Sequence, residues 1–324
     1  MNSQTKKIVS IIFKVAIISL AFLFIYHKLN NNHDLFKFSQ LTTSLTRHKV
    51  YSVLTVVLSL MFLNWFLEAL KWRFLVERIE RINIWQALES VFCGLTWAVF
   101  TPNRIGEYGG RMFFLSPRKR ILGAIAMAVG AIGQMVITNV MGATALLWFT
   151  WRFISPELWI YCVLVFLWMV FCGFFILIYF NISWLNYILN HFEILKPLRR
   201  FFFILARYRF KQLWKVFLYS ITRFVVFTSQ YYLIINLLLP ELLIFEICMM
   251  IFILFFIQSA IPSLDLLDVG VRSSVATYFF GFITGQDVAI MAATASVWFI
   301  NLIIPAILGA GFVLKINFFG TNNR

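Results

Sequence analysis

Residues 101–111 read TPNRIGEYGGR, and this polar stretch decides how the chain folds. It holds one proline, three glycines, two arginines and a glutamate. An apolar run, IWQALESVFCGLTWAVF (84–100), precedes it, and a second apolar run of nearly thirty residues (121–149) follows soon after. Proline and glycine interrupt helices. The stretch, called the first knot below, is therefore predicted to turn the chain between two membrane-length segments.

The composition around the knot is that of an integral membrane protein. The chain is 61% hydrophobic, contains 38 phenylalanines and only 13% charged residues, and has a mean hydropathy of +0.86. Soluble domains are about half apolar and a quarter charged. The sequence predicts an all-α polytopic helical bundle.

Six apolar segments are long enough to cross a bilayer, which takes about 20 residues. The first follows Lys6 and Lys7 like a signal peptide, but no small-residue cleavage pattern follows it, so we expect it to be retained. The six predicted spans are Ile8–Tyr26, Val50–Leu70, Ile121–Phe149, Leu158–Phe180, Gln212–Leu239 and Val288–Leu314.

Two further apolar segments each end at a proline and run into a polar stretch. The first leads into the first knot, and the second leads into IPSLDLLDVGVR (261–272), the second knot. The short pieces beyond the knots, Tyr108–Leu115 and Val271–Phe282, are too brief to span. The sequence therefore predicts two re-entrant helical hairpins, at 84–117 and 242–282, whose irregular backbone faces protein or water.

The net charge of +15 is assigned to loops beside anionic lipid heads and not to nucleic-acid binding. If both knots re-enter, five basic clusters fall on one side, which the positive-inside rule makes the cytoplasm. Both termini are then cytoplasmic, although the loop at 28–49 places four basic residues on the opposite side. The five clusters are 6–7, 71–81, 118–120, 196–211 and the residues from 315 onward.

The two knots share a pattern: acid, any residue, glycine, any residue, arginine. It runs from Glu107 to Arg111 and from Asp268 to Arg272. The offset of 161 residues is one less than half of this 324-residue chain. We therefore expect one membrane domain made of two repeats, 1–150 and 151–324. Each repeat holds three spans and one hairpin, so the repeats insert with opposite orientation, as in many secondary transporters.

Charged side chains at membrane depth cost about 3 kcal/mol each on insertion scales and normally face a cavity and a partner. The knot arginines present planar forks suited to phosphate, and the acids hold them in place or take up protons. The glycines let a head group or a helix approach the backbone. The candidate substrate-binding residues are Arg104, Arg111, Arg272, Glu107, Asp265, Asp268, Asn103 and Arg223; the candidate hinge or helix-break residues are Pro102, Gly106, Gly109, Gly110, Pro262 and Gly270.

The charged and polar residues of the spans and knots also have a structural interpretation. Glu107–Arg111 and Asp268–Arg272 are also i,i+4 pairs of the kind that make short helices tolerable in lipid. Arg223, near the middle of the fifth span, either faces the same cavity or bonds within the bundle. Glu68 and Asn64 in the second span are interpreted as inward-facing packing contacts.

Enzyme signatures are missing from the sequence. The four histidines are scattered, and there is no HExxH, GxSxG, GxxxxGK[ST] or GxGxxG motif. All four cysteines lie in apolar stretches without metal-ligand spacing. We expect neither catalysis, nor a cofactor, nor a metal site.

At the knots the sequence resembles the lysylphosphatidylglycerol synthase transmembrane-region family. TPNRIGE (101–107) is similar to that family's Thr-Pro-Gly-Arg-Ile-Gly-Glu-type motif, and PSLDLLDVGVR (262–272) stands in place of its glycine-rich second motif. Pro102, Arg104, Gly106 and Glu107 match the first motif, and Pro262 and Gly270 match the second. Asn103 replaces a glycine, and Leu264, Asp265 and Leu266 replace the glycine-rich centre.

The resemblance implies a lipid-translocating module of the bacterial inner membrane, here without the soluble aminoacyl-transferase domain. Our hypothesis is a flippase whose partners are membrane lipids, either anionic phospholipids or isoprenoid-phosphate-linked lipids. One alternative is an accessory protein that does not transport and that serves an enzyme of lipid-linked glycan or envelope lipid synthesis. Another is a membrane transferase that depends on Asp34.

Overall fold

The computed structural model describes residues 33–43, 45–99, 101, 104–182, 208–261 and 265–313, together with positions 12, 15, 19 and 23. Of residues 33–36, 38 and 265–269 it describes the backbone alone. Within this part of the chain, five helical stretches are long and apolar enough to cross a membrane, and they coincide with the last five predicted spans. The first predicted span, Ile8–Tyr26, lies outside the described ranges. The prediction of an all-α polytopic protein is confirmed.

The long helices follow the hydropathy of the sequence closely. A short helix α2 (His33–Thr43) precedes α3 (Arg47–Val76). Helix α6 (Arg120–Phe149) starts after a 3-10 turn at Pro117–Lys119 and ends in a π-helical turn at Thr150–Ile154, and α7 (Leu158–Phe180) follows. Beyond the gap come α10 (Phe210–Leu238) and a broken last span, made of α13 (Asp287–Trp298), a π-helical turn (Phe299–Ile303) and α14 (Ile304–Val313).

Each knot connects a pair of shorter helices that form a hairpin. In the first hairpin, α4 (Ile84–Ala98) begins with a capping box between Asn83 and Gln86 and is followed by α5 (Ile105–Met112). In the second, α11 (Ile244–Ala260) ends in extended backbone at Ile261, as expected before a proline, and is followed by α12 (Asp265–Phe280). Helix α12 begins at Asp265, six residues before the predicted Val271. The acidic residues of the second knot are therefore already helical.

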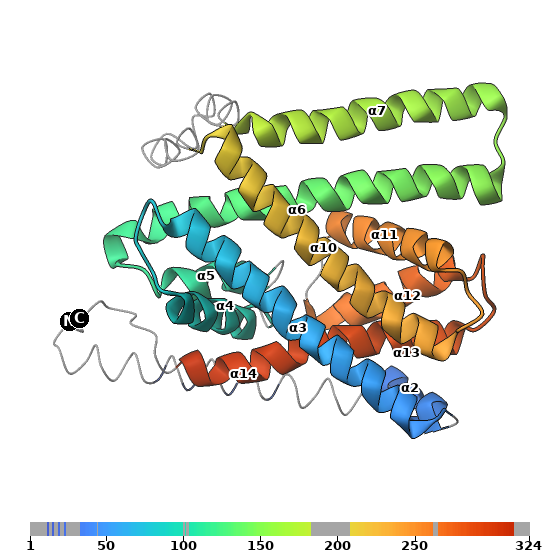
Figure 1. Ribbon diagram of the computed structural model, residues 1–324, viewed down its shortest axis with the longest axis horizontal. Helices are drawn as coiled ribbons and strands as arrows, with labels where there is room; N and C mark the ends of the chain where they lie inside the picture. Colours follow the sequence, from blue (N-terminus) through green and yellow to red (C-terminus); the bar gives the residue numbers. More distant parts are fainter. Residues whose placement is uncertain are drawn as a thin grey trace.

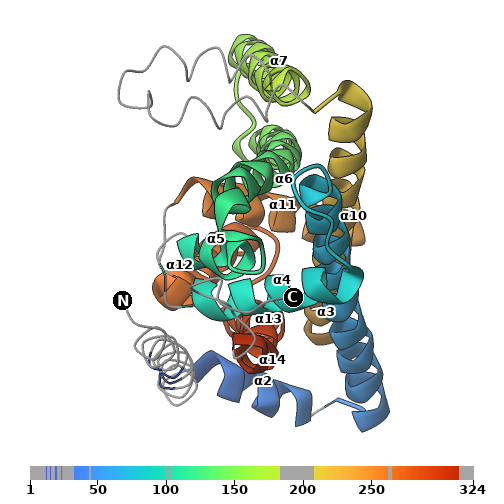
Figure 2. The ribbon, with the colours of Figure 1, turned by 90° about the vertical axis from the view of Figure 1, so that its left-hand side faces the viewer.

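The two hairpins enter the bundle from opposite ends (Figure 1). Helices α3 and α10 pack along each other on one side, and α6 and the α13–α14 pair enclose the hairpins between them (Figure 2). The loops before α4 and after α5 lie at the end where α10 begins (Figure 1). Whether the hairpins re-enter a membrane, and whether the halves at 1–150 and 151–324 are inverted repeats, stay predictions.

Each hairpin packs against a membrane-length segment of the other half of the chain. Helix α4 contacts α14, and α11 contacts α6. Both contacts are so close that a glycine is required. A Cβ added at Gly309 would lie 2.0 Å from the Phe92 carbonyl oxygen, and one at Gly142 would lie 2.2 Å from the Phe256 Cβ. In addition, the Thr96 hydroxyl donates a hydrogen bond to the Ala306 carbonyl at 2.8 Å.

Helix α10 and the residue pair before it are joined to α3 by hydrogen bonds and to α11 by an aromatic contact. The Gln230 side chain donates to the Val57 carbonyl at 3.0 Å, and the Tyr208 hydroxyl donates to the Leu75 carbonyl at 2.9 Å. Phe227 of α10 stacks on Phe255 of α11 with ring centroids 5.1 Å apart. These contacts hold α10 between α3 and the second hairpin, which determines where its polar residues lie.

Candidate functional site

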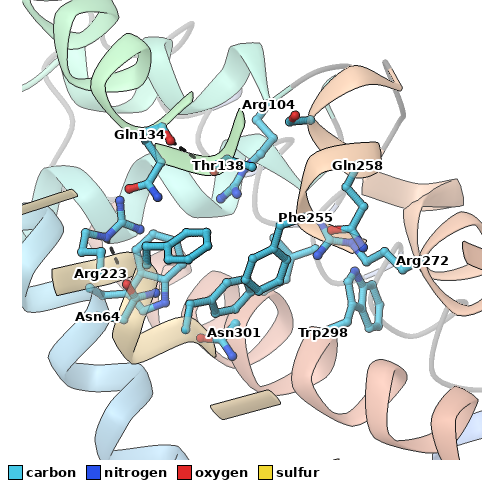
Figure 3. A pocket seen from close by; sticks show the side chains of 15 residues that line it. Asn64, Arg104, Gln134, Thr138, Arg223, Phe255, Gln258, Arg272, Trp298 and Asn301 are labelled. Atoms are coloured by element: carbon cyan, nitrogen blue, oxygen red, sulfur yellow. Dashed lines mark hydrogen bonds between the residues drawn. The ribbon is translucent and has the colours of Figure 1, made fainter. Parts of the chain in front are cut away.

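A cavity of about 320 Å³, lined by both polar and aromatic side chains, lies where the two halves meet. Both hairpins and four long helices supply its walls, and Figure 3 shows the side chains converging on it. Three arginines are among the lining residues that the structure describes. The lining consists of Asn64, Trp65, Arg104, Gln134, Thr138, Arg223, Phe224, Phe227, Phe255, Gln258, Ser259, Arg272, Trp298, Asn301 and Leu302.

Arg104 reaches the cavity from the turn of the first hairpin. Its backbone is left-handed, with φ 56° and ψ 26°, a conformation that non-glycine residues seldom adopt. The turn is held by Thr101, whose hydroxyl oxygen accepts a hydrogen bond from the Gly106 amide at 2.8 Å and donates to the Trp97 carbonyl at 3.0 Å. The Arg104 side chain is 37% exposed, with its Nε 3.4 Å from Glu107. Strained backbone of this kind is concentrated at functional sites.

Arg223 comes from the middle of α10 and faces the cavity. Its Nε donates to the Asn64 Oδ1 at 3.0 Å, and its guanidinium also forms an ion pair with Glu68. The guanidinium carbon lies 5.4 Å from the centre of the Trp65 ring. Asn64 and Trp65, which the sequence analysis treated as packing or did not single out, therefore position a cavity arginine.

Behind the cavity, Glu68 is the centre of a buried ion-pair network. It accepts from Lys71 at 2.8 Å and from Arg111 at 2.6 Å, in addition to its pair with Arg223. Arg111 also pairs with Glu107 on its own helix. The Arg111 side chain is only 1% exposed and is not part of the cavity lining. Its surroundings match the structural reading of the Glu107–Arg111 pair, in which it braces α5 against α3.

The ion pairs of this network join four cations to two carboxylates. Within the described side chains, the cations are Arg104, Arg111, Arg223 and Lys71, and the carboxylates are Glu68 and Glu107. The arginines that line the cavity present guanidinium forks, whose geometry matches phosphate oxygens.

The second hairpin contributes Arg272, from the second turn of α12, to the cavity lining. The structure describes only the backbone of Asp265 and Asp268, both within α12. Pro102, Asn103 and Pro262 lie outside the described residues. Arg272 and Arg111 share one pattern position in the two knots, yet one lines the cavity and the other is enclosed behind it.

The knot glycines serve different purposes. Gly106 lies in the first turn of α5, where an added Cβ would lie 2.3 Å from the Trp97 carbonyl oxygen. Gly110 lies where α5 crosses α4, and an added Cβ there would clash with the Gly94 Cα at 2.5 Å. A Cβ added at Gly109 would lie 3.4 Å from the Trp97 ring, whereas one added at Gly270 would have no atom within 4 Å. Gly109, Gly110 and Gly270 lie within helices and not at breaks.

Apart from Asn64, the uncharged polar residues of the cavity were not singled out from the sequence. Gln134 and Thr138 come from α6, Gln258 and Ser259 from α11, and Asn301 from the π-helical turn between α13 and α14. The available signal was a carboxamide inside an otherwise apolar span. For Asn301 a second signal was Pro305, because a proline disturbs the regular helix at the residue four positions before it. The structure has a π-helical turn there, and such turns are frequent at functional sites.

No group of three or more His, Cys, Asp or Glu side chains suited to a metal ion occurs in the described part of the chain.

Comparison with known proteins bears on the whole chain. A family model described as "Lysylphosphatidylglycerol synthase TM region" matches residues 11–316, nearly the full length. The resemblance carried by the first knot is thus confirmed. The chain matches no curated protein and no solved structure.

Proposed function

Because the chain belongs to the lysylphosphatidylglycerol synthase transmembrane-region family, we propose that it binds an anionic, phosphate-bearing lipid head group in the cavity and moves that lipid across the membrane. The observation that carries this proposal is the convergence of Arg104, Arg223 and Arg272 from three separate elements on one cavity (Figure 3). The lipid is carried without chemical change.

The arginines are suited to bind a phosphate and also to release it. Arg223 and Arg104 already have carboxylate partners in Glu68 and Glu107, so a phosphate competes with internal anions for them. This competition lowers the net gain from binding and keeps the head group from being trapped. A transporter needs such a balance, because a site that binds too tightly does not release its cargo.

The position of the cavity supports movement across the membrane. One hairpin from each end of the bundle contributes an arginine to it, so the site lies between the two tips. Sites at the meeting point of broken helices are common in transporters that alternate their access. Phe224, Phe227 and Phe255 form an apolar wall on one side, beside which the lipid tails can stay in hydrocarbon.

Binding is tested by native mass spectrometry of the lipids that co-purify with the wild type and with Arg223→Gln/Arg272→Gln. In this variant Glu68 keeps Lys71 and Arg111, so the network behind the cavity persists. We expect the wild type to retain a phosphate-bearing lipid. The double variant should retain at least tenfold less of that lipid per protein. The matched control, Arg118→Gln/Arg152→Gln, changes the charge equally at exposed positions and should retain the lipid. Equal retention in all three proteins would contradict the proposal.

Transport is tested separately in proteoliposomes containing nitrobenzoxadiazole-labelled phosphatidylglycerol. Wild-type protein should make the inner-leaflet label accessible to dithionite faster than empty vesicles, and Arg223→Gln/Arg272→Gln should abolish the gain. Retention of lipid without any acceleration would refute transport and favour an accessory protein that only binds.

A further inference from the structure

We propose that Lys71 is a positioning residue for lipid binding: it keeps Glu68 neutralised when a phosphate in the cavity draws Arg223 away from that carboxylate. This inference rests on the proposed function and concerns how one cavity arginine becomes available to the lipid. Lys71 itself does not line the cavity, so it acts on the lipid through Arg223.

The first step concerns how the two oxygens of Glu68 are shared among its cations. Oε1 accepts from the Arg111 Nη1 at 2.6 Å. Oε2 accepts from the Lys71 Nζ at 2.8 Å and also from the Arg223 Nη1. A carboxylate offers about four lone-pair positions to donors, so all three contacts can exist at once. One oxygen of Glu68 thus has two cationic partners, and it keeps one of them when the other leaves.

The second step concerns Lys71, which is held beside Glu68 and away from the membrane surface. A lysine near the end of a membrane-spanning helix usually extends its ammonium group to the interface. The Lys71 side chain, near the end of α3, is instead only 4% exposed. Its stem lies against α6, where a Cβ added at Gly130 would be 3.5 Å from the Lys71 Cε. Lys71 therefore stays on Glu68 whether or not the cavity is occupied.

The third step concerns Arg223, which is the partner of Oε2 that a ligand can reach. Its side chain is 15% exposed and lines the cavity. Its Nε donates to the Asn64 Oδ1 at 3.0 Å, and Asn64 lines the cavity as well. The pair with Glu68 is the contact that a phosphate has to replace.

Lys71 makes this replacement easier in two ways. Removing one partner of a buried ion pair is strongly unfavourable, because the remaining charge loses its compensation. With Lys71 on the same oxygen, Glu68 stays compensated after Arg223 has left. Lys71 also repels Arg223, because two like charges meet at one atom. Without Lys71, Arg223 is held more firmly by Glu68, and the phosphate binds more weakly.

The test is a native mass spectrometry titration of the purified full-length protein with dioleoyl phosphatidylglycerol, and phosphatidylcholine gives the background. Lys71→Met keeps an unbranched side chain and removes the charge. We expect it to bind phosphatidylglycerol roughly tenfold more weakly than the wild type, a usual size for coupling between linked sites. Lys71→Arg keeps the charge and should bind close to the wild type. Lys49→Met, at an exposed position of the same helix, is the matched control and should not change binding.

A double-mutant cycle with Glu68→Gln separates positioning from a general effect of charge or packing. In the Glu68→Gln background there is no carboxylate to hold Arg223, so adding Lys71→Met should change the affinity by less than about twofold. The same loss in both backgrounds would mean that Lys71 acts by its own field or by packing, and would overturn the proposal. If Glu68→Gln does not fold, equal losses in Lys71→Met and Lys71→Arg would overturn it.

The outcomes also separate this inference from the proposed function. If the wild type binds phosphatidylglycerol and Lys71→Met binds it equally well or more tightly, the role of Lys71 is wrong and the phosphate site stands. If the wild type binds phosphatidylglycerol no better than phosphatidylcholine, the proposed function fails and this inference fails with it.

Discussion

At the scale of single residues, the main distinction is between cations that face the cavity and cations that brace it. Arg104 and Arg223 are partly exposed, whereas Arg111 and Lys71 are enclosed around Glu68. Glu68 therefore anchors three positive charges from three helices. Its removal affects packing and ligand geometry together.

Glu68→Gln removes that shared counter-ion while keeping the size of the side chain. Removing one partner of a buried ion pair costs about 3–5 kcal/mol, because the remaining charges lose their compensation. We expect a fall of several degrees in the thermal unfolding midpoint, measured in detergent by intrinsic fluorescence. Glu241→Gln, an equal change at an exposed position, should leave the midpoint unchanged. Equal midpoints for both variants would show that the network contributes nothing to stability.

Arg104→Gly should change stability and binding in opposite directions. Glycine adopts left-handed backbone without the steric cost that arginine bears, so relief of that cost adds about 1 kcal/mol to the free energy of unfolding. The same change removes a guanidinium from the cavity and should weaken binding of anionic lipid severalfold. Denaturant unfolding and lipid titration on one preparation measure both. A variant that is less stable but binds normally would mean that Arg104 serves the fold alone.

At the scale of elements, the two hairpins differ in how closely their helices pack at the glycines. The first is closed by glycine contacts at Gly106 and Gly110, while the second has a longer return helix with Gly270 in open surroundings. The shared acid–glycine–arginine pattern thus occurs in two unlike environments. A short pattern specifies local helix geometry but not the neighbours against which the helix packs.

A set of alanine substitutions tests this difference. Gly106→Ala and Gly110→Ala should lower the unfolding midpoint strongly, because the new Cβ meets backbone atoms at 2.3 Å and 2.5 Å. Gly270→Ala serves as the internal control and should be neutral, or stabilising by about 0.5–1 kcal/mol, as expected for glycine to alanine inside a helix. Similar losses at all three positions would refute the proposed asymmetry.

At this scale the sequence predicts helices better than it predicts sites. The helix breaks at the knots could be predicted, because proline, glycine and charged residues interrupt apolar runs there. Irregular backbone of this kind is tolerated at membrane depth only where it faces protein or water. The role of Arg111 could not be read from its motif, because its partner Glu68 lies 43 residues away on another helix. Gln134, Gln258 and Asn301 were not predicted, because they carry no charge and no local pattern links positions so far apart along the chain.

At the scale of the whole molecule, the six-span arrangement with two re-entrant hairpins makes a topological prediction. In a cysteine-free background, Ser116→Cys and Gly285→Cys mark the exposed loops beyond the first and second hairpins. A membrane-impermeant maleimide should label them from opposite faces of inverted and right-side-out vesicles. Gly285 has open space around an added Cβ, so that variant should fold normally. Labelling of both from one face would rule out the inverted repeat.

The hydrogen bond from Thr96 to Ala306 and the packing of Gly309 on Phe92 connect positions more than two hundred residues apart. Chains are synthesised at roughly 5–20 residues per second, so α4 emerges about 10–40 seconds before α14 exists to receive it. Until then the face of α4 that will touch α14 must be covered by lipid or by an insertion factor. The first hairpin is therefore synthesised early, but it reaches its final packing only after α14, the last described helix, has been made.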